Sequence, residues 1–298
     1  MDAPLVSIGM PVRNCEKTLP LALRSLLAQT YRQWELLLTD DGSSDETLRL
    51  AEQFTDPRIK IYADGQNQGL AARLNQAIDM GQGKYFARMD GDDVAYPERL
   101  ERQVSYLEQH PEVDLVGAWV IVFNQAGIPL GKRASPEAHD AICARPFAGF
   151  PIAHPTYVGR LEWFRCYRYD EALPKSQDQE LLLRAYRFSR FANVPEILLG
   201  YREERIHLKK ILTGRWFFAK ALAREFCRQR RPGLAVRAVV EQVLKAILDC
   251  VAVGSGLNYH LLRHRAWPLS DSERRKWEYV WRIVNETEVK SCAASMAN

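Results

Sequence analysis

The sequence predicts an α/β fold with a mostly parallel central sheet, and three observations support it. Short apolar runs, typical of buried strands, alternate with segments of helical periodicity through the first half of the chain. A polar loop follows each apolar run. The chain has 298 residues, 47% hydrophobic and 26% charged, which is enough for one large domain with an appendage.

The elements follow one another in a regular order. The expected strands are 5–10, 34–39, 59–63, 84–89 and 113–123, and the expected helices are 18–30, 46–54, 70–80, 97–110 and a run from 178 that ends near Phe191. Ligands bind beyond the carboxyl ends of the strands in such sheets. The polar loops 11–14, 40–45, 64–69 and 90–93 are therefore expected to converge on one edge of the sheet.

The loop "MDGDDVAYPERL" places three carboxylates within four positions. Carboxylates this close raise one another's pKa values unless solvent, a basic partner or a metal ion compensates. A sharp turn at Gly91 would bring Asp90 and Asp92 toward one point, where their hard oxygen ligands suit Mg²⁺ or Mn²⁺. Asp93 lies close to the start of a helix and is expected to cap it.

Two further loops carry candidate nucleotide contacts. In "TDDGSSDET", the carboxylate of Asp41 can accept a hydrogen bond from a base N–H, such as the imide of uracil, whereas residues 43–47 are typical of a well-capped turn. In "GQNQGLAARLNQAI", Gly69 opens a helix whose first turn carries Arg73. That arrangement suits either a pyrophosphate at the helix N-terminus or a solvated arginine on an amphipathic face.

As a set, "VSIGMPVRN", "TDDGSSDET", "NQGLAARLNQAI" and "MDGDDVAYPERL" resemble, in order and spacing, the nucleotide-binding half of family 2 glycosyltransferases, which have a GT-A fold. The resemblance continues to "HPTYVGR" and "SQDQELLLRA" and covers about residues 4 to 202. It implies a GT-A catalytic domain over 1–202, with a nucleotide-sugar half (1–123) and an acceptor half (124–202), followed by a helical extension over 203–298.

The resemblance also implies the chemistry. Such an enzyme takes a nucleotide-diphosphate sugar, commonly a UDP-sugar, holds a divalent metal ion, and inverts the anomeric carbon during transfer. The expected acceptor is a hydroxyl of a saccharide, lipid-linked or other surface-glycan molecule. The Q/RxxRW motif of processive members is incomplete in "LTGRW", which disfavours a polymerase that makes long chains.

Site residues follow from the resemblance position by position. For the nucleotide sugar, it places Pro11 and Arg13 at the nucleoside, Asp41 at the base and Arg73 near the diphosphate. The DxD segment is Asp90, Gly91 and Asp92. Asp90 and Asp92 are the expected metal ligands, and Asp92 is favoured for direct contact. Asp178 falls where the family supplies its catalytic base, although Gln177 replaces the preceding Glu. From local sequence alone, Asp178 is equally a helix N-cap. His154 either lines the acceptor side or is a hydrogen-bonded histidine in a proline-bounded loop.

The C-terminal part differs in charge. From Tyr201 onward the chain has 19 Lys and Arg against 10 Asp and Glu, whereas residues 1–200 have 22 against 27. In the predicted helix after residue 234, Arg237, Glu241, Lys245 and Asp249 form a charged stripe, which favours an amphipathic helix over a membrane span. That helix is either a peripheral anchor on an anionic bilayer or a helix packed on the catalytic domain with its charged face in solvent.

The remaining features indicate the cellular compartment and limit the alternative functions. The N-terminus has no signal-peptide pattern and the six cysteines are isolated, so a protein with reduced thiols is expected, either free in the cytoplasm or peripheral on the inner face of the membrane. Nucleic-acid binding is not expected, because no such motif accompanies the basic residues. The alternatives are a non-catalytic nucleotide-sugar-binding protein and a nucleotidyltransferase, for which a glycine-rich basic loop is missing.

Overall fold

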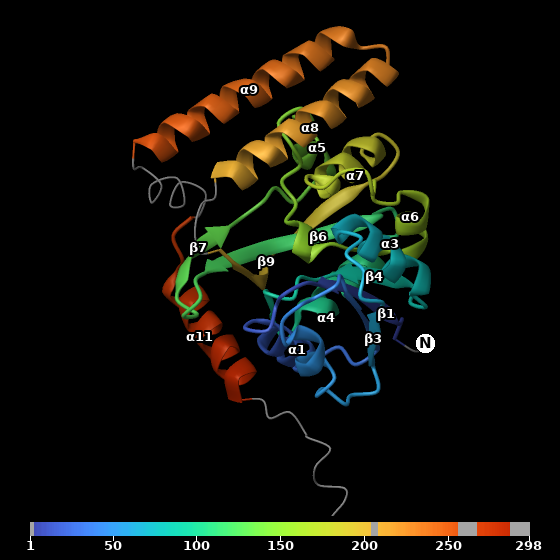
Figure 1. Ribbon diagram of the computed structural model, residues 1–298, viewed down its shortest axis with the longest axis vertical. Coiled ribbons are helices and arrows are strands. Elements are labelled where there is room, and N and C mark those ends of the chain that lie inside the picture. The colour runs from blue at the N-terminus through green and yellow to red at the C-terminus, as the bar shows by residue number, and fades with distance from the viewer. Residues whose placement is uncertain (1–2, 204–207, 256–266, 287–298) are drawn as a thin grey trace, which may run out of the picture.

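The computed structural model describes residues 3–203, 208–255 and 267–286 and confirms the α/β fold (Figure 1). Nine strands form one sheet in the order β3-β2-β1-β4-β8-β6-β9-β5, with β7 beside β6. Helices cover both faces of the sheet, and a helical extension follows it. The five cysteines in the described residues are free thiols, and Cys292 lies outside them.

The first half of the sheet is parallel, as the alternating pattern predicts. Its strands are β1 (Val6–Val12), β2 (Trp34–Asp40), β3 (Ile59–Ala63) and β4 (Tyr85–Arg88), connected by α1 (Leu19–Leu27), α2 (Thr47–Ala51) and α3 (Leu70–Met80). Every residue of β1 and β2 is buried. Burial on both faces explains why these strands read as continuous apolar runs in the sequence.

Beyond β4 the sheet is mixed. Its strands are β5 (Val94–Ala95), β6 (Leu115–Phe123), β7 (Pro129–Arg133), β8 (Val158–Arg160) and β9 (Phe191–Arg202). The β6–β9 pair is parallel, whereas β8 is antiparallel to β4 and β6, β7 to β6, and β5 to β9. The short turn between β6 and β7 leaves only an antiparallel hairpin for that pair.

Five short helical segments complete the part of the chain that ends with β9. They are α4 (Arg99–Gln109), α5 (His139–Ile142), the 3₁₀ segment η1 (His154–Thr156), α6 (Leu161–Cys166) and α7 (Gln177–Ala185). Helix α7 ends at Ala185, earlier than the predicted end near Phe191. The reason is that Phe191 pairs with Leu115 as the first residue of β9, and the preceding backbone N–H of Arg190 donates to Asp114.

Three long helices follow the sheet. Helices α8 (Leu208–Arg228) and α9 (Pro232–Gly254) form a hairpin that packs beside α7, and α11 (Asp271–Glu286) lies away from it, beside α1 (Figure 1). Among the described helices, none combines the length and the apolarity needed to cross a bilayer.

Helix α9 turns Glu241, Lys245 and Asp249 of its charged stripe toward the protein, so the expectation of a charged face in solvent holds only for Arg237, which is exposed. Asp249, 5% exposed, pairs with Arg215 of α8 at 2.6 Å. The ammonium group of Lys245 donates to the carbonyl of Ala148 and pairs with Glu241 at 2.8 Å. These partners lie far away in the sequence, on α8 and on the segment before Phe150, which is why periodicity alone could not give the orientation.

The buried indole of Trp277 packs helix α11 against the sheet. Trp277 is 1% exposed, its Nε1–H donates to the carbonyl of Gly127 at 2.8 Å, and its ring lies 4.8 Å from that of Phe123. The ring also fills the space beside Gly200, where an added Cβ would lie 2.5 Å from it. Trp277 therefore joins α11 to both β9 and the β6–β7 turn.

We predict that Trp277→Ala lowers the free energy of unfolding by about 3 to 5 kcal/mol, because it empties a large packed site. Urea denaturation measures this loss. The control is Tyr279→Ala on the same helix, where the side chain is 52% exposed; its cost should stay within about 0.5 kcal/mol. Equal costs for the two variants would contradict the packing described for α11.

Candidate active site

The predicted loops do converge at the carboxyl edge of the parallel strands. The loops after β1 and β2 are joined by the N–H of Asn14, which donates to Ser43 Oγ at 3.0 Å. The loops after β2 and β3 are joined by Asp41, which accepts the N–H of Gly69 at 3.0 Å. The segment after β1 reaches the acidic loop through Thr18, whose hydroxyl donates to the carbonyl of Gly91 at 2.9 Å.

Asp41 occupies the centre of the predicted nucleotide half. Its carboxylate is 7% exposed as a residue and accepts the backbone N–H groups of Gln68 and Gly69 at 2.7 and 3.0 Å. With its amide oriented to satisfy both partners, Asn67 donates to Asp41 at 3.1 Å and accepts from the guanidinium of Arg13. Pro11 lies buried within β1. Asp41 thus ties the loop 66–69 to the end of β2.

Arg73 lies under this loop and not on its surface. The side chain is 1% exposed, and its Nε–H donates to Asp41 at 3.2 Å. The two terminal nitrogens donate to Asp64, to Gln76 and to the carbonyl of Gln66. These contacts engage all five N–H groups of the guanidinium, which leaves none for the diphosphate contact that the sequence analysis expects.

The acidic loop gathers three carboxylates. One oxygen each from Asp90, Asp92 and Asp93 lies within 4.8 Å of the others. Burial, followed by the charge of Asp90, raises the pKa of Asp92 to about 6, and burial raises the pKa of Asp93 well above its ordinary value. Burial is the larger cause of both shifts, and the charges of the neighbouring carboxylates add to it.

Asp93 does not cap α4, so that expectation was wrong. The N-cap position of α4 is Glu98, and no side chain caps the helix there. Asp93 instead accepts the backbone N–H of Arg202 at 3.0 Å, because the pairing of β5 with β9 brings these residues together. Its second oxygen is buried without a hydrogen-bond partner among the described residues.

Arg88, which is not among the predicted site residues, lies beside the acidic loop. Its guanidinium is 3% exposed and binds Asp90 with two contacts of 2.6 and 2.5 Å. An arginine at the end of an otherwise apolar strand, two residues before a DxD, was the available signal. A buried guanidinium of this kind stabilises the ionised form of a neighbouring carboxylate.

Asp178 lies in the first turn of α7, as predicted, but does not act as its N-cap. The N-cap residue is Ser176, and the Asp178 carboxylate accepts from the side chain of Gln179 at 3.2 Å. Burial raises the pKa of Asp178, while the positive charge of Arg88 opposes the shift. The same arginine therefore acts on both the acidic loop and the predicted base.

His154, at the start of η1, contacts two tyrosines. Its Nε2 lies 2.9 Å from the hydroxyl of Tyr169, and its ring packs 4.9 Å from that of Tyr157. Burial, helped by the positive charge of Arg88, lowers the pKa of His154 well below its ordinary value. The imidazole is thus neutral, and it is hydrogen-bonded as the second of the two alternatives for His154 expects.

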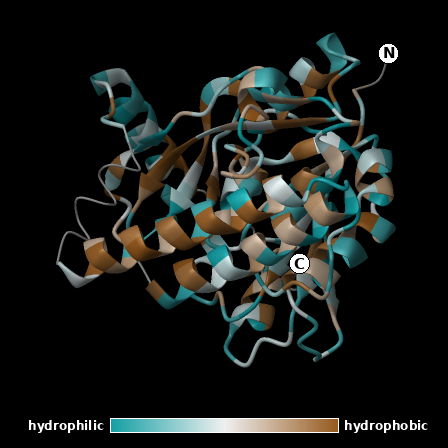
Figure 2. Cartoon of the chain, turned by 90° about the horizontal axis from the view of Figure 1, so that it is seen from above, coloured by the Kyte–Doolittle hydropathy of each residue, from teal (hydrophilic) through white to brown (hydrophobic). Residues whose placement is uncertain are grey.

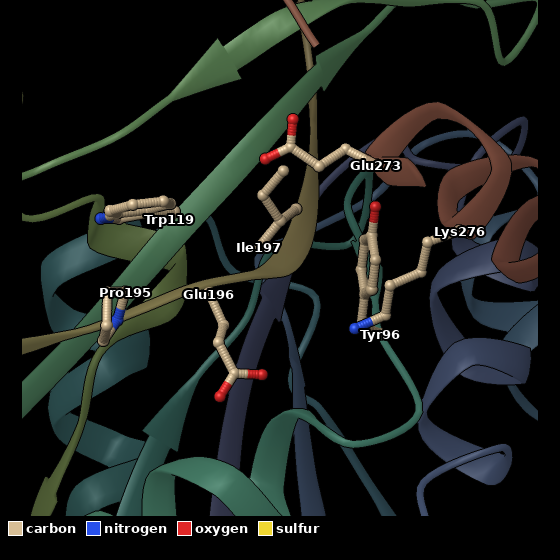
Figure 3. Close-up of a pocket in the computed structure, with 7 residues that line it drawn as sticks. All are labelled: Tyr96, Trp119, Pro195, Glu196, Ile197, Glu273 and Lys276. Atoms are coloured by element: carbon tan, nitrogen blue, oxygen red, sulfur yellow. The ribbon is translucent and has the colours of Figure 1, made fainter. Parts of the chain in front are cut away.

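A separate hollow lies between β6, β9 and α11 (Figure 3). It is lined by Tyr96, Trp119, Pro195, Glu196, Ile197, Glu273 and Lys276. Glu273 already pairs with Lys132, and Lys276 with Glu98. The hollow includes no residue predicted for the site, and its charges are engaged in ion pairs.

Comparisons with known proteins agree on one family. The model of glycosyl transferase family 2 matches residues 7–161. The putative glycosyltransferase EpsE of Bacillus subtilis (strain 168) is 38% identical over 217 residues, covering 70% of this chain and 77% of EpsE. The Escherichia coli UDP-Glc:alpha-D-GlcNAc-diphosphoundecaprenol beta-1,3-glucosyltransferase WfgD is 36% identical over 137 residues, covering 46% of this chain and 53% of WfgD.

Solved structures share the fold. S. aureus TarS 1-349 in complex with UDP superposes with a TM-score of 0.61 at 18% identity, over 94% of this chain and 80% of that one. The mannosyltransferase PcManGT from Pyrobaculum calidifontis, in complex with GDP-Man and Mn2+, gives a TM-score of 0.57 at 15% identity, over 96% and 87%. Since the family model covers more than half of the sequence and EpsE matches most of it, the chain belongs to glycosyl transferase family 2 and is a glycosyltransferase with a GT-A fold.

Proposed function

We propose that this glycosyltransferase moves a single sugar from a UDP-sugar to a hydroxyl of a lipid-linked or other saccharide acceptor, with the help of a divalent metal ion and with inversion. The observation that carries the proposal is the group of three carboxylate oxygens, from Asp90, Asp92 and Asp93, within 4.8 Å of one another and backed by the buried guanidinium of Arg88. The UDP bound to TarS and the acceptor named for WfgD support the donor and acceptor classes.

The nucleotide half recognises the nucleoside in this proposal. Asp41 accepts from the base, and Pro11 and Arg13 flank the nucleoside at the end of β1. Arg73 acts through Asp41: its buried guanidinium fixes the carboxylate and neutralises its charge. A carboxylate held in this way is presented to a ligand without the cost of ordering it at the moment of binding.

The acidic loop suits a divalent cation. Three hard oxygen ligands lie close together, one oxygen of Asp93 is buried and unpartnered among the described residues, and the raised pKa of Asp92 marks a need for positive charge. Asp92 is the direct ligand in this proposal, because Asp90 is engaged by Arg88. Gly91 supplies the turn between them. When bound, Mg²⁺ or Mn²⁺ neutralises the diphosphate and makes it a better leaving group.

Asp178 is the proposed general base. It removes the proton of the acceptor hydroxyl as that oxygen attacks the anomeric carbon from the face opposite the diphosphate, so one displacement inverts the carbon. The raised pKa of its buried carboxyl makes it a stronger base than an exposed aspartate. His154, held neutral beside Tyr169, offers a hydrogen bond to the acceptor without adding charge.

The expected organisation and location complete the proposal. Residues 1–202 form the catalytic domain, with the donor half over 1–123 and the acceptor half over 124–202, and residues 203–298 form the extension. Free thiols suit a reducing compartment, so the proposed location is the cytoplasmic side of a membrane that carries the acceptor.

The first test is thermal stabilisation by UDP in the presence of Mn²⁺, comparing the wild type with Asp92→Ala. We expect stabilisation of the wild type at saturating UDP and its loss in the variant, because ligand binding to the folded state raises the unfolding temperature. Asp140→Ala is the control, since Asp140 is exposed on α5. Stabilisation of Asp92→Ala equal to that of the wild type would exclude the acidic loop as the metal site.

The second test concerns the base. Asp178→Asn should retain UDP stabilisation and lower the rate of sugar transfer by about 10² to 10⁴. Because the folded pKa is raised, wild-type activity should fall as the pH drops through a value above that of an ordinary aspartate, where the carboxylate takes up a proton.

The acid limb of this pH–rate profile should be missing from the residual activity of Asp178→Asn and unchanged in Asp140→Asn, which makes the same chemical change at an exposed position. An unaltered acid limb in Asp178→Asn would assign the base to another group. Unaltered turnover would exclude Asp178 as the general base.

A further inference from the structure

The outer face of α9 is a continuous apolar surface. Seven of its large apolar side chains are between 50% and 67% exposed: Val236, Val240, Val243, Leu244, Ile247, Leu248 and Val251. They recur every three or four residues, so they share one face of the helix. Figure 2, which views the molecule from the side of α9, shows hydrophobic segments recurring along this helix. We call these seven residues the apolar face of α9.

The opposite face of α9 carries the polar contacts with the protein. Gln242 is 3% exposed and donates to the carbonyl of Phe147 at 2.9 Å, and Asp249 pairs with Arg215. Glu241 pairs with Lys245. A helix of a globular protein ordinarily buries its apolar stripe and exposes its charges. Helix α9 instead exposes its apolar stripe. Its apolar face is therefore available to a binding partner outside the described residues.

The apolar surface extends onto α8. A shallow groove between the two helices is lined by Ala223, Ala235, Val236, Val239 and Val240. On the outer side of α8, Trp216 is 64% exposed and Lys220 is exposed. An exposed apolar surface of this extent is typical of a docking site and unusual for a free protein surface.

The charges around this surface are basic. Arg230 and Arg231 in the turn between α8 and α9 are exposed, and Arg228 at the end of α8 is 68% exposed in its side chain, where it pairs with Glu225. An apolar helical face with a tryptophan beside it and arginines at its end matches the chemistry of the boundary between lipid headgroups and acyl chains. Anionic headgroups attract such basic residues.

We propose that the hairpin of α8 and α9 docks on an anionic lipid bilayer through the apolar face of α9. The helices lie in the plane of the interface, with the apolar side chains among the acyl chains and the arginines of the turn among the headgroups. A neutral protein partner would match the apolar face but not the basic turn.

Docking deepens the proposed function, on which the following step rests. Helix α7, which begins beside Asp178, packs on α8: the hydroxyl of Ser176 donates to the carbonyl of Gly214 at 2.9 Å, and Glu180 pairs with Arg224. The bilayer would therefore lie against the two helices next to the proposed base. An acceptor whose saccharide is attached to a lipid would then reach Asp178 from the membrane on which the enzyme rests.

The experiment is co-sedimentation of the full chain with vesicles of phosphatidylcholine alone and of phosphatidylcholine mixed with phosphatidylglycerol. The wild type should bind the anionic vesicles and bind the neutral ones more weakly. Leu244→Glu combined with Leu248→Glu should lower partitioning by about tenfold or more, because it places two charges in the acyl region. The matched control is Ile128→Glu with Leu130→Glu, which makes the same changes at exposed positions of the β6–β7 hairpin and should bind like the wild type.

UDP stabilisation with Mn²⁺ is measured for every variant, so that a failure of docking is distinguished from a failure of the donor site. Retained vesicle binding in the Leu244 and Leu248 variant would overturn the proposal, as would a wild type that stays in solution at low salt. Sedimentation velocity without vesicles tests the competing occupant. A wild-type dimer that this variant converts to a monomer, with no vesicle binding by either, would identify the apolar face as an interface between two copies.

Discussion

The ion pair between Arg88 and Asp90 is the interaction on which the site depends. Arg88 is buried at the end of β4, where it offers one compensating charge to the three carboxylates of the next turn. The same charge lowers the pKa of His154 and opposes the rise at Asp178. A neutral or exposed residue at this position would leave the acidic loop uncompensated, and repulsion would favour its protonation or its movement into solvent.

A second buried arginine, Arg99, holds the backbone at Arg88 in place by hydrogen bonds. The carbonyl of Arg88 accepts from the buried guanidinium of Arg99, which also donates to the carbonyl of Pro155 at 2.8 Å. One arginine on α4 thus joins the end of β4 to the segment that carries His154. The acidic loop and the segment with His154 are thereby held side by side by hydrogen bonds within the protein. That arrangement suits a reaction in which two substrates must meet in line.

The sequence allowed the sheet edge and its loops to be predicted, because strand and helix periods and the positions of Asp41, Asp90 and Asp178 are local properties. It did not allow three orientations to be predicted. Arg73 turns inward because Asp64 and Asp41 come from two other loops. Asp93 turns toward β9 because β5 pairs there. The face that α9 presents to solvent was inverted, since its partners at 147–148 and 215 are distant in sequence.

The most direct test of the account is the pH dependence of UDP stabilisation with Mn²⁺ in the wild type, Arg88→Met and Arg88→Lys. Arg88 lowers the pKa of Asp92, so replacing Arg88 by Met should raise that pKa. As the pH is lowered, half of the stabilisation should then be lost at a pH about one unit or more above the wild-type midpoint. Because Lys keeps the charge, Arg88→Lys should have a midpoint close to that of the wild type. Circular dichroism confirms that each variant is folded. A folded Arg88→Met with the wild-type midpoint would contradict the role given to Arg88.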